Sequence, residues 1–245
     1  MTTPTRRSFL KIAGAGAGAM TLGGLSLPAL AATSVANKSA KQDLDILNYA
    51  LTLEYLEAEF YNAFTGSGAY ASRLTDTRVR SYARNLASHE NDHVTALQGT
   101  IRALGGMPFT KPNIDFSPLL TNSDGSAKTV NDELFLALAN TFEPIGVRAY
   151  LGQADRILNG DVLTAAASIL AVEANHASGI QELRTQLGFN KKPTRQTSRA
   201  PQSDAKPTST NVADFDGDFS PTPTDFWTPL SMEDVLAMVK PLIKS

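Results

Sequence analysis

The chain contains no cysteine among its 245 residues. Disulfides, thiolate metal sites and cysteine nucleophiles are therefore excluded, as is a built-in C-x-x-C module for electron delivery. Histidine is scarce, so any imidazole chemistry must use His89, His93 or His176. No basic stripe is interleaved with aromatics, which argues against nucleic acid as a partner. The hydrophobic fraction of 42% and net charge of −2 indicate a globular protein with a sizeable core.

Residues 1–31 predict an export signal rather than part of the fold. Arg6 and Arg7 begin the run "RRSFLK", which is typical of twin-arginine signals. The apolar stretch that follows is interrupted by glycines and is too weak for a stable membrane anchor. It ends in "ALA", a small-x-small pattern that predicts cleavage after Ala31. We therefore expect the twin-arginine export machinery to deliver a mature protein to the periplasm or the extracellular space.

Four long segments carry apolar residues at three- and four-residue spacings, which predicts helices over 42–64, 75–105, 131–158 and 161–187. The expected N-caps are Thr75 or Asp76, Thr129 or Asn131, and Asp161. Short connections make the first two and the last two helices antiparallel hairpins, while residues 107–130 can travel the length of a helix. No segment has strand periodicity. The predicted fold is all-α, a four-helix bundle over 42–187 with one long crossover.

The remainder of the chain divides into two parts. Residues 188–230 are rich in proline, serine and threonine, which predicts a linker. Residues 231–245 predict a short amphipathic helix with Ser231 as its N-cap and acidic residues in its first turn. We expect this C-terminal helix to pack against the bundle.

The run "SHENDH" at 88–93 contains H-E-x-x-H, the helical zinc motif of many metalloproteases. This interpretation makes His89 and His93 zinc ligands and Glu90 the general base. It needs a third ligand, and no further histidine lies within reach of the motif, although Glu133 or Glu143 could serve. A zinc protease is therefore one hypothesis, but it leaves a second pattern unexplained.

That second pattern is an internal repeat. Two of the three histidines follow a glutamate by three residues, which puts both side chains on one helical face. The other two helices share Thr-x-Glu-x6-Tyr, in "TLEYLEAEFY" at 52–61 and "TFEPIGVRAY" at 141–150. Each predicted hairpin therefore supplies two glutamates and one histidine. The set is Glu54, Glu90 and His93 from the first hairpin, and Glu143, Glu173 and His176 from the second.

Four glutamates and two histidines on facing helices resemble the di-metal arrangement of the ferritin-like superfamily, which includes bacterioferritin, rubrerythrin and manganese catalase. Within it, "LDILNYALTLEYLEAEFYNAF" is most similar to the ferritin-like domain group associated with desiccation-related proteins. The resemblance implies two Fe or two Mn ions. Glu90 and Glu173 would bridge them, Glu54 and Glu143 would each bind one ion terminally, and His93 and His176 would complete the two shells.

Four other residues have open roles. Tyr61 and Tyr150 either donate hydrogen bonds to the ligand carboxylates or are plain core aromatics. Glu57, one turn from Glu54, is an extra ligand, an acid beside the ligands or, as the default, a surface charge. Pro144 follows Glu143 inside a predicted helix and should remove a backbone hydrogen bond and kink it.

Two classes of function fit the resemblance. One is an oxidoreductase that acts on peroxide, O₂ or Fe(II), catalase-like or ferroxidase-like, in oxidative or desiccation stress. The other is a non-catalytic module that holds metal or protects under stress. A homodimer is a possible assembly in either case.

Overall fold

The computed structural model describes residues 38–189, 227 and 229–244. The predicted signal, its cleavage point after Ala31 and most of the predicted linker at 188–230 lie outside the described residues.

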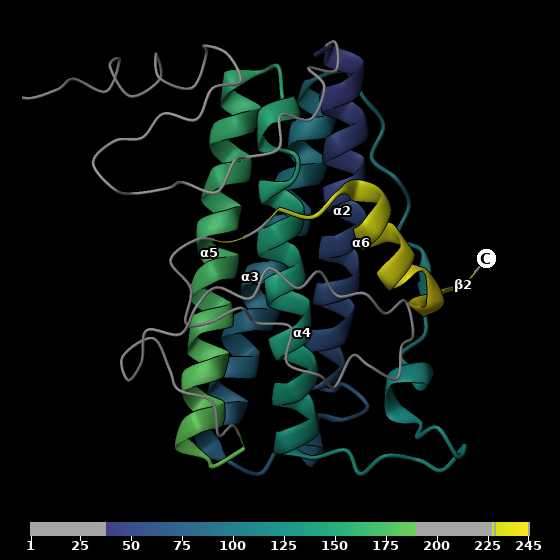
Figure 1. The fold of residues 1–245 in the computed structure, drawn as a ribbon, viewed down its shortest axis with the longest axis vertical. Helices are drawn as coiled ribbons and strands as arrows, with labels where there is room; N and C mark the ends of the chain where they lie inside the picture. The colour runs from purple at the N-terminus through teal and green to yellow at the C-terminus, as the bar shows by residue number, and fades with distance from the viewer. Residues whose placement is uncertain (1–37, 190–226, 228, 245) are drawn as a thin grey trace, which may run out of the picture. The chain divides into compact units, whose positions relative to one another are not determined.

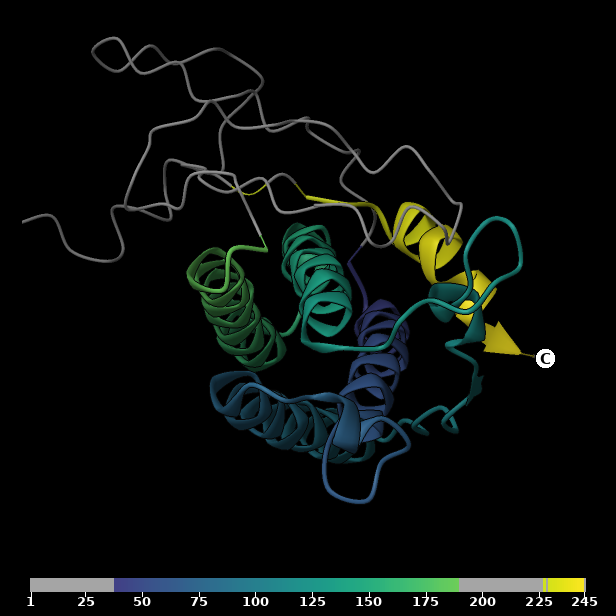
Figure 2. The same ribbon diagram turned by 90° about the horizontal axis from the view of Figure 1, so that it is seen from below.

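Four long helices form the bundle, as predicted. They are α2 (Ala40–Ala63), α3 (Thr77–Ala103), α4 (Asp132–Leu151) and α5 (Gly160–Gln186). Figures 1 and 2 show them side by side, with α2 between α3 and α4, and α5 beside α4. Asp76 caps α3 and Asn131 caps α4, each accepting backbone N–H groups of the first turn, as expected. In the described residues no helix is long and apolar enough to cross a membrane.

The end of α4 differs from the prediction. The helix was expected to reach Leu158, but it ends at Leu151 and is followed by a 3₁₀ turn over Ala154–Arg156. The Asp43 carboxylate of α2 accepts backbone N–H groups from Leu158 and Asn159, each at 2.8 Å. Asn159, rather than Asp161, then caps α5, its side-chain oxygen lying 2.8 Å from the Asp161 nitrogen. A long-range contact therefore sets this boundary.

Pro144 does not interrupt α4, which runs without a break from Asp132 to Leu151. The proline therefore does not end the helix, and the kink expected at this residue stays a prediction. Nearly every residue of α4 is buried, so tertiary packing holds the helix together across the missing N–H.

The C-terminal segment packs on the bundle but is not helical throughout. Ser231 caps α6 (Met232–Val239) as predicted. A 3₁₀ turn over Lys240–Leu242 follows, with Pro241 in its first positions. Strand β2 (Ile243–Lys244) then pairs antiparallel with β1 (Asn113–Ile114) of the crossover, a ladder that the sequence did not predict. Figure 1 shows α6 lying across the bundle beside α2.

The apolar core forms two clusters along the bundle axis. One includes residues of the C-terminal segment and Phe60, whose ring stacks on that of Phe135 with the ring centroids 5.7 Å apart. The other lies toward the end of α3 and the beginning of α5, with Leu97 and Ile169 as members. The predicted metal ligands of α3 and α5 lie between these two clusters. Apolar side chains therefore pack on both sides of the ligands along the bundle axis.

We predict that Gly152→Ala weakens the docking of residues 229–244. A Cβ at Gly152 would overlap the carbonyl oxygen of Leu230, whose N–H is 3.0 Å from the Arg148 carbonyl. Overpacking of this kind costs about 1–3 kcal/mol. Denaturant unfolding should report the loss, and hydrogen exchange should show faster exchange at Leu230. Gly160→Ala is the matched control, because nothing lies within 4 Å of its Cβ position. Equal stabilities of the two variants would contradict the prediction.

Candidate metal centre

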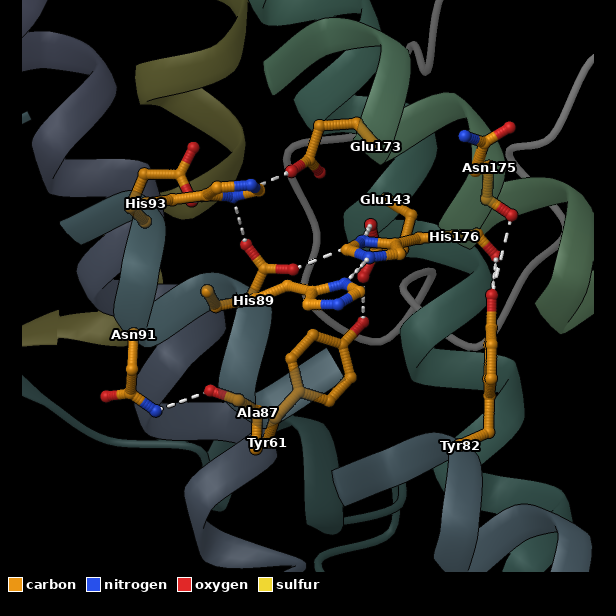
Figure 3. Close-up of polar contacts among 12 residues, drawn as sticks. Tyr61, Tyr82, Ala87, His89, Asn91, His93, Glu143, Glu173, Asn175 and His176 are labelled. Atoms are coloured by element: carbon orange, nitrogen blue, oxygen red, sulfur yellow. Dashed lines mark hydrogen bonds and ion pairs between the residues drawn. The ribbon is translucent and has the colours of Figure 1, made fainter. Parts of the chain in front are cut away.

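The six predicted ligands meet in the middle of the bundle, although they come from four helices. All four glutamates, Glu54, Glu90, Glu143 and Glu173, are 0% exposed, and His93 and His176 are 9% and 4% exposed. Figure 3 shows the side chains of His93, Glu143, Glu173 and His176 pointing toward one another from α3, α4 and α5. Carboxylates are buried to this degree only when they are neutralised by a partner or by a metal ion.

The donor atoms form two overlapping groups, each compact enough for one ion. In each group the possible ligand atoms lie within 4.8 Å of one another. Both groups contain Glu90 and Glu173. The first adds Glu54 and His93, and the second adds Glu143 and His176. Two carboxylates shared between two adjacent cation positions are the arrangement that a pair of bridged metal ions requires.

Both histidines direct Nδ1 at the carboxylates. His93 Nδ1 lies 2.9 Å from Glu90 Oε2 and 3.1 Å from Glu54 Oε2. His176 Nδ1 lies 3.0 Å from Glu143 Oε2 and 3.1 Å from Glu90 Oε1. The two oxygens of Glu90 thus face different histidines, so this carboxylate already spans the two halves of the site.

The two tyrosines join the hairpins to each other. The Tyr61 hydroxyl of α2 donates to Glu143 Oε1 on α4, and the Tyr150 hydroxyl of α4 donates to Glu54 Oε1 on α2 at 2.5 Å. Burial and the neighbouring carboxylates raise both tyrosine pKa values well above the ordinary range. Each hydroxyl therefore keeps its proton and fixes one carboxylate, leaving the other oxygen free to face the histidines. Tyr61 and Tyr150 are hydrogen-bond partners of the carboxylates rather than plain core aromatics.

The carboxylates of the site must be neutralised by protons or by metal ions. Burial and repulsion from Glu173 raise the pKa of Glu90 to about 8, although the close contacts with His176 and His93 oppose the shift. Burial, followed by repulsion from Glu143, also raises the pKa of Glu173 well above its ordinary value. Burial alone would lower the pKa of His93, but hydrogen bonds to the carboxylates outweigh it and raise the value to about 12. Protons thus occupy the positions where cations would neutralise the carboxylates.

Several carboxylate oxygens lack a hydrogen bond of good geometry. These are Glu90 Oε1 and both oxygens of Glu173, the two residues common to the donor groups. A histidine nitrogen approaches one oxygen of each, at 3.1 Å for Glu90 and 3.3 Å for Glu173, without the angles of a hydrogen bond. Unsatisfied, buried, acceptor-only oxygens of this kind fit metal ions. Oxygen and nitrogen donors without sulfur suit Fe or Mn.

Glu57 is buried, which excludes the default of a surface charge and leaves the other two roles, an extra ligand or an acid beside the ligands. It is 4% exposed, and burial followed by repulsion from Glu173 raises its pKa well above the ordinary value. In the repeat its position corresponds to Gly146. A Cβ at Gly146 would lie 2.6 Å from Glu173 Oε2 and 3.3 Å from Glu57 Oε1. Gly146 therefore makes the space that these two carboxylates share, a role that sequence analysis missed.

His89 contacts the site from outside it. The residue is exposed, and its Nδ1 lies 2.8 Å from His176 Nε2, the nitrogen that faces away from the carboxylates. Figure 3 shows the two rings stacked. Among the described residues neither donor group combines His89 with His93, as zinc binding by H-E-x-x-H requires. The geometry therefore favours the carboxylate cluster over the zinc-protease hypothesis.

Tyr82 also positions the site and was not foreseen. Its hydroxyl donates to the His176 carbonyl at 3.1 Å, and it occupies the place that a Cβ at Gly179 would take. The available signal was the glycine three residues after His176, on the same face of α5. This contact sets the spacing of α3 and α5 beside the imidazole (Figure 3).

We predict that His89→Ala weakens metal binding at the His176 position without abolishing it. Loss of a hydrogen-bond partner of a metal-ligating histidine costs about 10- to 100-fold in affinity. Competition titration with a chelator should measure this change. His89→Asn, which can still accept from His176 Nε2, should recover part of the affinity. His93→Ala serves as the comparison and should be more severe. Complete loss of metal in His89→Ala would instead support the zinc-protease hypothesis.

We predict that the metal-free protein loses stability as pH rises. Between the ordinary value of 4.5 and the folded-state pKa of about 8, Glu90 keeps a proton that the unfolded chain has released. The free energy of unfolding should therefore fall with rising pH across this window. The raised pKa of His93 acts in the same direction above 6.5. Urea unfolding in the presence of a chelator would measure the slope. A flat or rising stability would contradict the shifts.

A family model described as a ferritin-like domain matches residues 42–186. A second model, of the twin-arginine translocation pathway signal sequence, matches residues 3–23. No curated protein matches the chain. The first match covers more than half of the chain and all four bundle helices, and the second agrees with export to the periplasm or the extracellular space. The chain therefore belongs to the ferritin-like domain family and is exported by the twin-arginine pathway.

Proposed function

We propose that the exported protein binds two Fe or two Mn ions through Glu54, Glu90, His93, Glu143, Glu173 and His176, and uses them to reduce a small oxidant. The observation that carries the proposal is the sharing of Glu90 and Glu173 by the two donor groups. A single-ion site would not need two overlapping groups. A purely structural salt-bridge network would not leave both oxygens of Glu173 without a hydrogen bond.

The residues of the chain have distinct tasks in this proposal. Glu90 and Glu173 would hold both ions, while Glu54 with His93 and Glu143 with His176 would each complete one position. Tyr61 and Tyr150 keep the terminal carboxylates in place and retain their own protons. The apolar clusters on either side exclude water from the ions. When bound, two such ions supply a pair of electrons together, so an oxidant is reduced without releasing a radical.

Peroxide is one oxidant that needs no further electron donor. In its dismutation two H₂O₂ give two H₂O and one O₂, so one molecule is reduced and the other oxidised. The chain has no cysteine-based electron-transfer module, which is consistent with a reaction that balances by itself. Oxidation of Fe(II) as a substrate is the other reaction of this class. A non-catalytic metal-holding role in oxidative or desiccation stress is the competing function.

We predict that bridging and terminal variants differ in metal content. Elemental mass spectrometry of the mature protein, purified after export, should find about two Fe or Mn per chain. Glu90→Gln or Glu173→Gln should lose both ions, because each removes a ligand from both positions. Glu54→Gln or Glu143→Gln should lose about one. Glu59→Gln is the control, since this half-exposed residue of α2 pairs with Lys111.

The outcome separates the candidate functions. Two ions together with peroxide or Fe(II) turnover would support the oxidoreductase. Two ions without turnover of peroxide, O₂ or Fe(II) would support the metal-holding role. One Zn per chain would revive the protease, and a chain that takes up no metal even after reconstitution would overturn the proposal.

A further inference from the structure

A cavity lies in the bundle core, one helical turn from the candidate metal centre. On three helices its lining residues are four positions from a predicted ligand: Ala50 from Glu54, Leu97 from His93, and Ile169 from Glu173. One turn of α-helix rises about 5.4 Å. Because these helices alternate in direction, the offsets of −4, +4 and −4 all point to the same end of the bundle. The cavity and the metal centre are therefore adjacent layers of one core.

The cavity is small and almost wholly apolar. Its volume is about 40 Å³, and its walls are mainly leucine, isoleucine, valine and alanine. The buried Tyr49 hydroxyl and Gln153 amide nitrogen have no hydrogen-bond partner, but they expose almost no surface to the cavity. A water-sized probe takes about 10–15 Å³ by such a measure, so the space fits a molecule of two or three heavy atoms. A longer organic substrate does not fit.

The outer end of the cavity lies between α3 and α5. Ala96 of α3 and Ala165 of α5 line it and are exposed, while Thr100 and Ala166 beside them are partly exposed. These side chains are small, so the two helices leave an opening where larger residues would close it. The cavity thus connects the surface of the bundle with its interior.

The inner end reaches the metal centre through one residue. Tyr150 lines the cavity, and its hydroxyl donates to Glu54 Oε1 at 2.5 Å. Leu53, the neighbour of Glu54, also lines it. A molecule in the cavity is therefore separated from the terminal carboxylate of the first donor group by a single tyrosine side chain.

We propose that this cavity binds dioxygen and is its route to the metal centre. Dioxygen is diatomic and apolar, and dry apolar cavities take up such ligands. Hydrogen peroxide has the same number of heavy atoms, but it would give up its hydrogen bonds to water and find no partner on the cavity surface. The cavity therefore discriminates between two oxidants that the metal centre alone would not. The inference deepens the proposed function, and its role in turnover rests on that function.

Xenon tests the binding site without any metal. The sample is the metal-free form of the mature protein. Bound xenon should give either a separate ¹²⁹Xe NMR resonance, in slow exchange, or a shift of the free-xenon resonance, in fast exchange. Ala166→Leu fills the cavity from α5 and should lose that signal. Ala167→Leu is the matched control on the same helix, because Ala167 is exposed and does not line the cavity. Absence of bound xenon in the unsubstituted protein overturns the cavity proposal, whatever metal the protein binds.

Reaction rates test the route. With Fe(II) bound, two Fe(II) become two Fe(III), and their two electrons with two protons convert one O₂ to H₂O₂. Stopped-flow mixing should show that Ala166→Leu slows the reaction with O₂ while leaving the reaction with added H₂O₂ unchanged. Ala96→Leu closes the opening from the α3 side and should also slow the reaction with O₂ alone. Because Ala96 is exposed, this variant should fold even if Ala166→Leu does not.

Failure of the route and failure of the proposed function give different results. Bound xenon with an unchanged O₂ rate in both variants overturns the route but leaves the metal centre intact. If the variants slow the reactions with O₂ and with H₂O₂ equally, the metal centre is damaged, and the proposed route is also overturned. A protein that binds xenon but no redox metal refutes the proposed function and, with it, the assignment of dioxygen as a reactant.

Discussion

The rest of the structure depends on the burial of five carboxyl groups side by side in a helical core. Glu54, Glu57, Glu90, Glu143 and Glu173 are each 4% exposed or less, and four of them contact two histidines. Their mutual repulsion and desolvation must be offset by protons or by metal ions, because no lysine or arginine ion pair reaches them in the part of the chain described. Two further features follow from this constraint. The tyrosine hydrogen bonds fix the carboxylates in place, and the absence of a side chain at Gly146 leaves space for them.

The internal repeat explains how one chain builds such a site, and its departures from symmetry make the two positions unequal. The tyrosines exchange partners, so that each hairpin fixes a carboxylate of the other and the ligands assemble only when both hairpins pack. Glu57 in the first hairpin corresponds to Gly146 in the second, which gives the cluster a fifth acid on one side only. His89 corresponds to Val172, so only His176 has an imidazole behind it. The two halves share a ligand set but not their surroundings.

Periodicity and capping residues were enough to predict the four helices and their pairing, and the two E-x-x-H motifs with the internal repeat selected the six side chains that meet in the core. These predictions depend on local patterns repeated along the chain. The misses depend on contacts between distant segments. The end of α4 is set by Asp43 of α2 and by Leu230, and the short strand at the C-terminus exists only because it meets the crossover. The role of Glu57 stayed open between an extra ligand, an acid beside the ligands and a surface charge, because α2 is buried around most of its circumference and its apolar pattern does not separate an inner from an outer face. The partners of Tyr61 and Tyr150 required knowing which helices are neighbours.

The surroundings of the two tyrosines differ, and the proposed entrance for dioxygen lies beside only one of them, Tyr150. The ring of Tyr61 packs against those of Phe135 and Phe60, with ring centroids 6.0 Å and 5.1 Å away. The same cluster also includes Phe142. Around Tyr150, at the equivalent place in the repeat, most of the neighbours that line the cavity are small or aliphatic. Phenylalanine fills one end of the duplicated core, whereas alanines keep the other open. A symmetric ligand set with symmetric packing would either be sealed at both ends or open at both, and only the asymmetric version combines a rigid wall with an entrance for a small reactant.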